Sequence, residues 1–278
     1  MKIKTITKTA LFVLGIGVIV AFGEKGLTQS NVTGWKYDKD FGFTTKGGFV
    51  IKSDVPFGMV AIEGGTFAFG QNTEITSTTV DNRQRNVTVC SLYMDQYEIR
   101  NIDWREYTTW MKIVFDSVAP DLVLKSQPNV NVWREAMAYN EPYLQNYFSH
   151  PAFDQYPVVG VSWVQAAEYC KWRTDRVNEM IMVREGFINL DIQKQTGDQN
   201  FNTEAYLLGL YTPSVKKELR DYSPGGKQRQ VRMEDGILLP SYRLPTESEW
   251  EYAASAYKTA GYNENVDVKR IYPWNGLT

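Results

Sequence analysis

The chain has 278 residues, of which 43% are hydrophobic and 14% aromatic, which is enough apolar material for a packed core in one or two domains. Its 30 basic and 32 acidic residues nearly balance, and neither sign forms a long run. This balance excludes the basic surface expected of a nucleic-acid-binding protein, so we expect no nucleic-acid partner.

The first segment has the pattern of an export signal. Lysines near the start precede an apolar run over residues 10–22, which is shorter than the ~20 residues that span a bilayer. Small residues precede a cleavage site after Gly23. We therefore expect residues 1–23 to be a cleaved signal peptide. The alternative is an uncleaved anchor, which would associate the N-terminus with a membrane.

The only cysteines are Cys90 and Cys170, so no cysteine follows the signal at the place where a lipoprotein would be acylated. Their spacing does not decide whether they form a disulfide. Cys170 falls on the expected apolar face of a helix, which favours a buried free thiol.

Residues 24–55 are rich in Gly, Thr, Lys and Asp, with scattered aromatic residues, and we expect an extended N-terminal arm. From Pro56 the pattern predicts a β-hairpin with its turn at Gly64-Gly65, closing before Gly70. A second strand-like stretch covers residues 86–99.

Asn101 is placed to cap a helix whose apolar face carries Tyr107, Trp110, Met111 and Val114. The next segment, residues 128–161, is punctuated by Pro and Asn and is expected to be a long packed loop rather than regular structure.

Two features of this expected loop bear on function. His150, the only histidine, has no thiol or second imidazole near it in sequence and is a weak candidate for metal or acid–base chemistry. The loop also gathers aromatic residues, most of which should pack inward while some face outward: Trp133, Tyr139, Tyr143, Tyr147, Phe148, Phe153 and Tyr156.

Ser162 and Gln165 have the spacing of a capping box and predict the start of the longest helix. Residues 186–238 are polar and interrupted by Gly and Pro, so we expect a surface insertion with short helices at most. Further on, Thr246 and Glu249 form a second capping box, with Pro245 positioned to pack on Trp250. Ala253, Ala254 and Tyr257 would share the face of Trp250.

Three separated segments, residues 59–70 (MVAIEGGTFAFG), 156–172 (YPVVGVSWVQAAEYCKW) and 242–254 (YRLPTESEWEYAA), are followed by YPW at 272–274. Together they resemble the formylglycine-generating-enzyme-like, or sulfatase-modifying-factor, domain family. The resemblance implies an α+β, loop-rich, C-type-lectin-related domain over residues 56–278, with the family's C-terminal portion absent. The matching motif positions are Gly64, Gly65, Gly70, Ser162, Trp163, Arg243, Pro245, Thr246, Glu247, Glu249, Trp250, Pro273 and Trp274.

The closest likeness within the family is to its gliding-motility lipoproteins, on segments such as TGWKYDKDFGF and KWRTDRVNE. It implies a non-enzymatic scaffold at the periplasmic face of the outer membrane, with protein subunits of the type IX secretion and gliding machinery as partners. The motif positions would then be structural, with no catalytic, cofactor or metal residues. Calcium is implied only if the family's C-terminal portion is present.

Two other functions stay open. The resemblance also extends to copper-dependent oxidases that convert cysteine to formylglycine, but Cys90 and Cys170 match neither enzyme cysteine, so the copper thiols would have to lie in the absent portion. A ligand-binding module on a lectin-like fold would need a calcium site.

Overall fold

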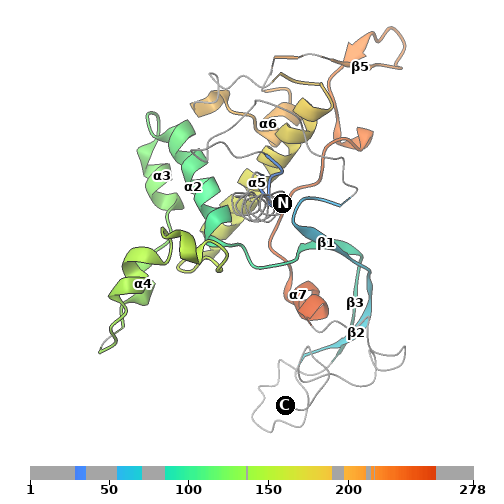
Figure 1. Ribbon diagram of the computed structural model, residues 1–278. Helices are drawn as coiled ribbons and strands as arrows, with labels where there is room; N and C mark the ends of the chain where they lie inside the picture. The colour runs from blue at the N-terminus through green and yellow to red at the C-terminus, as the bar shows by residue number, and fades with distance from the viewer. Residues whose placement is uncertain are drawn as a thin grey trace, which may run out of the picture.

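The computed structural model describes residues 29–35, 55–70, 85–135, 137–189, 197–210, 214–215 and 217–254, except the side chain of Asp198. Helices gather on one side of the described chain and a long β-ribbon lies on the other (Figure 1). The proposed signal peptide, most of the arm, Tyr257, Pro273 and Trp274 lie outside the described residues.

The ribbon consists of two antiparallel ladders in one register. β1 (Met59–Ile62) pairs with β4 (Leu92–Asp95), and β2 (Gly65–Phe69) pairs with β3 (Arg85–Val89). The strand expected over residues 86–99 is therefore confirmed as β3 and β4.

The expected β-hairpin is wrong, because β1 and β2 do not pair with each other. Residues 63–64 join the two strands in a single pass along the ribbon, and each strand finds its partner in the later segment. Gly64 is needed because the backbone of residues 89–91 lies very close to it, and not because the chain turns there. A Cβ there would lie 2.5 Å from both the Val89 carbonyl oxygen and the Ser91 nitrogen.

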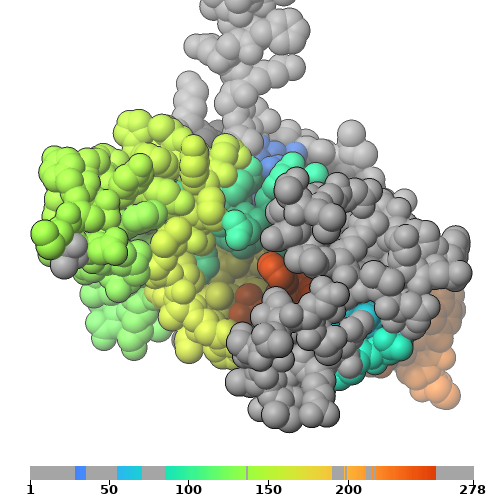
Figure 2. Space-filling view, turned by 90° about the horizontal axis from the view of Figure 1, so that it is seen from below, coloured from blue at the N-terminus to red at the C-terminus, as the bar shows by residue number. Residues whose placement is uncertain are grey.

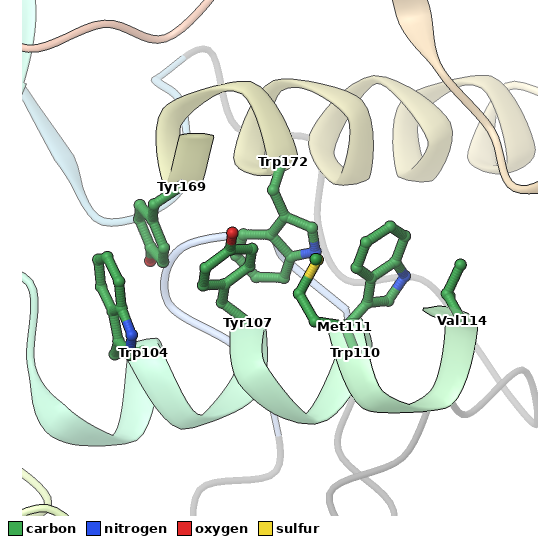
Figure 3. Packing of buried hydrophobic residues seen from close by; sticks show 7 residues of the cluster. All are labelled: Trp104, Tyr107, Trp110, Met111, Val114, Tyr169 and Trp172. Atoms are coloured by element: carbon green, nitrogen blue, oxygen red, sulfur yellow. The ribbon is translucent and has the colours of Figure 1, made fainter. Parts of the chain in front are cut away.

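Two helices form the main core. α2 (Asn101–Phe115) and α5 (Trp163–Arg184) face each other through aromatic side chains, and Trp104 stacks on Tyr169 at 5.0 Å between ring centroids (Figure 3). The expected apolar face of α2 is confirmed. The cluster consists of Trp104, Tyr107, Trp110, Met111, Val114, Tyr169 and Trp172.

The cap of α2 differs from expectation. Arg100 is the N-cap residue, and its backbone nitrogen donates to Asp103 at 3.2 Å. Asn101 is inside the helix and buried, and its amide donates to the carbonyls of Tyr147 and Phe153, each at 3.0 Å. Asn101 therefore fastens the following segment to α2 instead of starting the helix.

That following segment is more regular than expected. After α3 (Pro120–Ser126) come the short helices η2 (Val130–Trp133), α4 (Glu141–Asn146) and η3 (Pro151–Phe153). Pro occupies the first or second position of α4 and η3, where its missing N–H costs nothing, so the punctuation starts helices rather than preventing them. We call residues 130–156 the α4 lobe.

Where the structure describes the expected insertion, its elements are short, as predicted. They are η5 (Gly197–Gln199), α6 (Thr203–Leu207), β5 (Leu219–Arg220), β6 (Gln228–Arg229) and η6 (Met233–Asp235). It is not merely a surface excursion, however. Its apolar residues form a buried cluster with Met182 of α5, namely Phe187, Ile188, Phe201, Tyr206, Val231 and Leu238.

α7 (Glu247–Ala254) packs on β2 and β3 through a different face from the one predicted. Tyr252 is buried, whereas Trp250, on the face predicted to be apolar, is 62% exposed, and Pro245 is exposed too. The contact expected between Pro245 and Trp250 stays a prediction. A short helix that lies across a ribbon buries only a narrow stripe of its own surface. In α7 the Tyr252 ring fills that stripe. In the described part of the chain, none of the helices has the length and apolar character needed to cross a membrane.

Candidate functional site

Two of the three motif segments meet where α7 packs on the ribbon, and the third forms the start of α5. Arg173, one residue beyond the third segment, connects α5 to β4, and we call these contacts together the junction. Gly65 faces Tyr252, and a Cβ at position 65 would lie 2.6 Å from the tyrosine hydroxyl oxygen. That hydroxyl donates to the Glu63 carbonyl at 3.0 Å, and the ring lies 5.3 Å from Phe67. Gly65 therefore provides room for α7 to pack on the ribbon.

The start of α7 has the predicted capping box. The Thr246 hydroxyl accepts from the Glu249 nitrogen at 3.3 Å, and the Glu249 carboxylate accepts from the Thr246 nitrogen at 2.8 Å. Arg243 holds the same carboxylate with two hydrogen bonds of 2.7 and 2.8 Å. The hydrogen bonds from Arg243 lower the pKa of Glu249 to about 2, with the Thr246 contacts adding to the effect.

The start of α5 is built in the same way. The Ser162 hydroxyl accepts from the Gln165 nitrogen at 3.3 Å, and the Gln165 side chain accepts from the Ser162 nitrogen at 2.8 Å. The Gln165 amide also donates to the carbonyls of Lys125 and Gln127 at 2.8 Å each, so this box fixes the end of α3.

The remaining motif positions are divided between surface and core. Trp163 and Trp250 are 74% and 62% exposed, and Glu247 is exposed in the first turn of α7. Gly70 is buried with φ at 107°, a backbone conformation that favours glycine. These positions therefore do not converge on one reactive point.

The strongest electrostatic feature of the junction is Arg173, which the motif comparison missed. Its buried guanidinium holds both oxygens of Asp95 at 2.7 and 2.8 Å and donates to the carbonyls of Val32 and Phe57. It also lies 4.6 Å from the centre of the Tyr242 ring. One side chain thus connects α5, β4, the start of the ribbon and the N-terminal segment.

Burial works against the charge on Arg173, but the hydrogen bonds and the charge of Asp95 outweigh it, and the pKa of Arg173 is raised. Burial raises the pKa of Tyr242 to about 12, against the opposing influence of Arg173. Both side chains therefore keep their ordinary protonation at neutral pH, which suits a structural centre.

A second buried charge pair lies one turn further along α5. Arg176 and Glu179 form an ion pair with both side chains almost fully buried, and Arg176 lies 4.6 Å from the centre of the Trp110 ring. The sequence carries one signal that could have identified Arg173, Arg176 and Glu179 as buried charges. In CKWRTDRVNE, charged side chains recur at helical spacing on the apolar face of the predicted helix.

The cysteines and the histidine are placed apart from this centre. Cys90 is exposed on the ribbon, and Cys170 is half-buried on α5, where burial raises the pKa of its thiol; both are free. Cys170 is free, as expected, but it is only half-buried where a buried thiol was expected. His150 is exposed and caps η3 by accepting from the Ala152 nitrogen at 3.1 Å.

Within the described ranges, no three His, Cys, Asp or Glu side chains are grouped so that they could hold a metal ion. The junction joins the helices, the ribbon and α7 through capping boxes, one arginine and close glycine contacts.

The described chain is thus an α+β domain, rich in loops, in which helices and small sheets are joined by capping boxes and a buried arginine. The family model of the sulfatase-modifying factor enzyme 1-like domain matches residues 52–277, and the chain belongs to this family. No curated protein sequence matches the chain.

Proposed function

We propose that this protein is a non-catalytic, exported scaffold that binds protein subunits of a secretion and motility machinery in the bacterial envelope. The observation that carries the proposal is the aromatic surface of the α4 lobe. The family shown by the comparison includes both enzymes and non-enzymatic members, so the choice between them rests on this surface and on the roles of the motif residues.

The α4 lobe has a small aromatic core beneath an exposed rim. Trp133 lies 5.4 Å from Tyr143 and 4.7 Å from Tyr147, and Tyr147 lies 5.2 Å from Phe153, all between ring centroids. Tyr147 is buried, and its hydroxyl donates to the Pro157 carbonyl at 2.8 Å. The core thus holds the lobe together and fixes the position of the Tyr143 ring, which stacks on Trp133.

The rim of the lobe is apolar and well exposed. Tyr139, Tyr143 and Tyr156 are 84%, 45% and 54% exposed, and Met137 is fully exposed with φ at 67°. A positive φ at a residue with a side chain is uncommon. Figure 1 shows this lobe, in green, projecting from the body of the molecule.

These properties fit a protein-binding surface. Tyrosine is enriched at interface hot spots because it offers a large amphipathic contact area with little side-chain entropy to lose. Rings already fixed by Trp133 and Tyr147 would lose less freedom on binding than isolated ones.

The likeness to gliding-motility lipoproteins supports a particular setting for this surface. In this proposal the scaffold acts at the inner face of the outer membrane, with subunits of the type IX secretion and gliding machinery as partners. The apolar run at residues 10–22 supports export.

The test is a pull-down from envelope extracts with the full chain and with Tyr139→Ala and Tyr143→Ala. Tyr147→Ala is unsuitable, because its ring and hydroxyl hold the lobe together. Tyr222→Ala is the matched control, since Tyr222 is as exposed as Tyr139 (84%) but lies between β5 and β6.

We expect secretion-machinery subunits to be captured by the wild type and by Tyr222→Ala. Replacing a hot-spot Tyr on the lobe should cost about 2 kcal/mol or more of binding free energy, with an unchanged melting temperature. If both lobe variants recover every partner as well as the wild type, the lobe is not the binding surface.

The family description favours a second candidate, a copper-dependent oxidase acting on cysteine. It would need a pair of nearby thiolates as soft copper ligands. Its test is copper(I) affinity and formylglycine formation. Thiol-dependent tight copper binding that is lost in the Cys90→Ala, Cys170→Ala double variant would overturn the scaffold, and so would formylglycine formed in a sulfatase-motif peptide.

A further inference from the structure

The N-terminal segment 29–35 lies outside the family match, yet it is part of the core. Four of its residues, Ser30, Val32, Thr33 and Trp35, are at most 6% exposed. Figure 1 shows the segment, in blue, beside α5. We call residues 29–35 the clasp, and the place where it sits against α2 and α5 the clasp groove.

Many backbone groups of the clasp form hydrogen bonds within the clasp itself. The Ser30 nitrogen donates to the Trp35 carbonyl at 2.7 Å, and the Gly34 nitrogen donates to the Ser30 carbonyl at 3.2 Å. The Ser30 hydroxyl accepts from the nitrogens of Val32 and Thr33 at 3.2 and 3.0 Å. The segment is therefore a closed turn that carries its shape with it.

The clasp groove recognises this turn through three specific polar contacts. The Thr33 hydroxyl donates to Glu106 of α2 at 2.7 Å, and the Arg173 guanidinium donates to the Val32 carbonyl at 2.9 Å. The Trp35 indole donates to the Arg176 carbonyl at 3.0 Å. Its ring packs with residues of α5, namely Val177, Met180 and Ile181.

Shape adds to this recognition. Gly34 and Gly58 both have positive φ, and a Cβ on Gly34 would lie 2.5 Å from the Phe57 ring. A Cβ on Gly58 would lie 2.5 Å from the Asn31 carbonyl oxygen. The two backbones approach so closely that only a segment with glycine at the Gly34 position fits.

The chain between the clasp and the body is long enough for the clasp of one copy to reach the groove of another. Residues 36–54 separate it from the next described residue, Val55. These 19 residues can extend over at most roughly 65 Å, which is enough to reach a neighbouring copy. All the contacts above are made by the clasp itself.

We propose that the clasp groove is a peptide-binding site that also accepts the clasp of a second copy, so that copies of this protein associate by exchanging their N-terminal segments. The occupant is a second copy because the chain itself carries the sequence that fits the groove. Exchange of an identical element is an established route to self-association. The inference is independent of the proposed function.

The balance between the two arrangements depends on concentration. A clasp joined to its own groove competes with an effective concentration on the order of millimolar. Exchange should therefore be a minor state in dilute solution and should increase as the protein is concentrated.

The experiment traps exchanged clasps with a short cysteine-to-cysteine cross-linker in the full chain carrying Cys90→Ser. Asn31 on the clasp and Gln96 on the body are both exposed. They are close together, because Asn31 contacts Gly58 and the Gly58 carbonyl accepts from the Gln96 nitrogen at 3.1 Å. One copy carries Asn31→Cys and a tagged copy carries Gln96→Cys.

Three controls accompany the experiment. Gln145→Cys replaces Gln96→Cys in the tagged copy, because Gln145 is exposed on α4, in the projecting lobe (Figure 1). The double variant Asn31→Cys, Gln96→Cys reports whether the clasp occupies its own groove, and the Cys90→Ser parent gives the contribution of Cys170.

We expect a cross-linked pair of tagged and untagged copies whose yield rises with concentration and falls when a synthetic peptide of residues 27–37 is added in excess. Adding Trp35→Ala to the Asn31→Cys copy should lower the yield by about tenfold or more, because a buried Trp anchor is costly to remove. A yield equal to the Gln145→Cys background at every concentration would overturn the proposal. So would failure of the double variant to cross-link, because the clasp would then not occupy the groove.

Discussion

Arg173 determines how firmly the segments around α5 are joined. Its guanidinium donates to both Asp95 oxygens and to the carbonyls of Val32 and Phe57, so four acceptors from three segments depend on one side chain. The planar fork of arginine fits this bidentate geometry, and lysine would not reproduce it. A buried ion pair such as Arg173–Asp95 contributes little more to stability than apolar packing would. Removing one partner, however, leaves the other without its hydrogen bonds.

Arg173→Ala is therefore expected to lower the free energy of unfolding by about 3–5 kcal/mol, the range for removing one partner of a buried ion pair. The measurement is chemical denaturation at neutral pH. Lys171→Ala is the control on the same helix, because Lys171 pairs with Glu168 at the surface with a 71% exposed side chain. It should change stability by no more than about 0.5 kcal/mol. Equal effects of the two variants would show that Arg173 does not join these segments.

The lowered pKa of Glu249 makes the stability of the fold depend on pH in the acid range. Its carboxylate accepts from Arg243 and from the Thr246 nitrogen, and its pKa is lowered from 4.5 to about 2. A group with a lowered folded-state pKa stabilises the fold above its unfolded pKa, and that contribution is lost as the pH falls toward the folded value.

Glu249→Gln should therefore destabilise the protein most at about pH 6, and the gap to the wild type should narrow between pH 4.5 and about 2. Glu247→Gln, exposed in the same turn, gives the background of losing one carboxylate from the start of the helix. Denaturation curves at several pH values give the comparison. A gap that stays constant down to pH 2 would contradict the ion pair with Arg243.

At the scale of elements, the meeting of α7 and the ribbon depends on Gly65. A Cβ there would lie 2.6 Å from the Tyr252 hydroxyl oxygen, whereas a Cβ on Gly64 would meet backbone atoms on the facing strand. The first conflict involves the end of a side chain and can be relieved, and the second cannot. This difference makes the two neighbouring glycines separable by experiment.

Gly65→Ala and Gly64→Ala should each destabilise the fold by about 1–3 kcal/mol through overpacking. Tyr252→Phe removes the hydroxyl and should offset part of the loss in Gly65→Ala, but none of it in Gly64→Ala. A double-mutant cycle of unfolding free energies measures this coupling. The same coupling at both glycines would place the α7 contact elsewhere.

The elements show where sequence patterns were sufficient and where they were not. Both capping boxes were predictable, because the partners lie three residues apart and their geometry is local. The ribbon pairing was not, because β2 finds its partner only after residues 71–84, and a glycine pair signals both tight turns and close contacts. Tyr252 was missed because a short helix offers several faces, and the ribbon determines which one is buried.

The candidate site also has features that the sequence predicts and features that only the fold reveals. Helical spacing indicates that α5 buries charged residues, but the acceptors of Arg173 come from residues 32, 57 and 95, which only the fold brings together. The aromatic content of the α4 lobe was evident from sequence. Which rings face outward depends on how Trp133 and Tyr147 pack, so the exposed members could not be chosen beforehand.

For the molecule as a whole, the folding unit extends beyond the family match. The match begins at residue 52, but the clasp, residues 29–35, completes the core around α5 and supplies an acceptor to Arg173. A domain defined by the family boundary would leave the clasp groove empty, with its apolar lining exposed to water.

Trp35 provides the test, since its ring packs on α5 and is 6% exposed. Trp35→Ala removes that packing and the indole hydrogen bond to the Arg176 carbonyl, so it should cost about 3–5 kcal/mol of unfolding free energy. Trp163→Ala is a control with the same chemical change, because Trp163 is 74% exposed at the start of α5. Its effect should stay within about 0.5 kcal/mol.

The measurement is equilibrium denaturation of the full chain, followed by circular dichroism because both variants alter the tryptophan fluorescence. If the clasp belongs to the same cooperative unit as the helices, Trp35→Ala should move the whole transition to lower denaturant with an unchanged slope. A clasp that only rests on a finished domain would leave the midpoint of Trp35→Ala equal to that of Trp163→Ala, and the folding unit would then end at the family boundary.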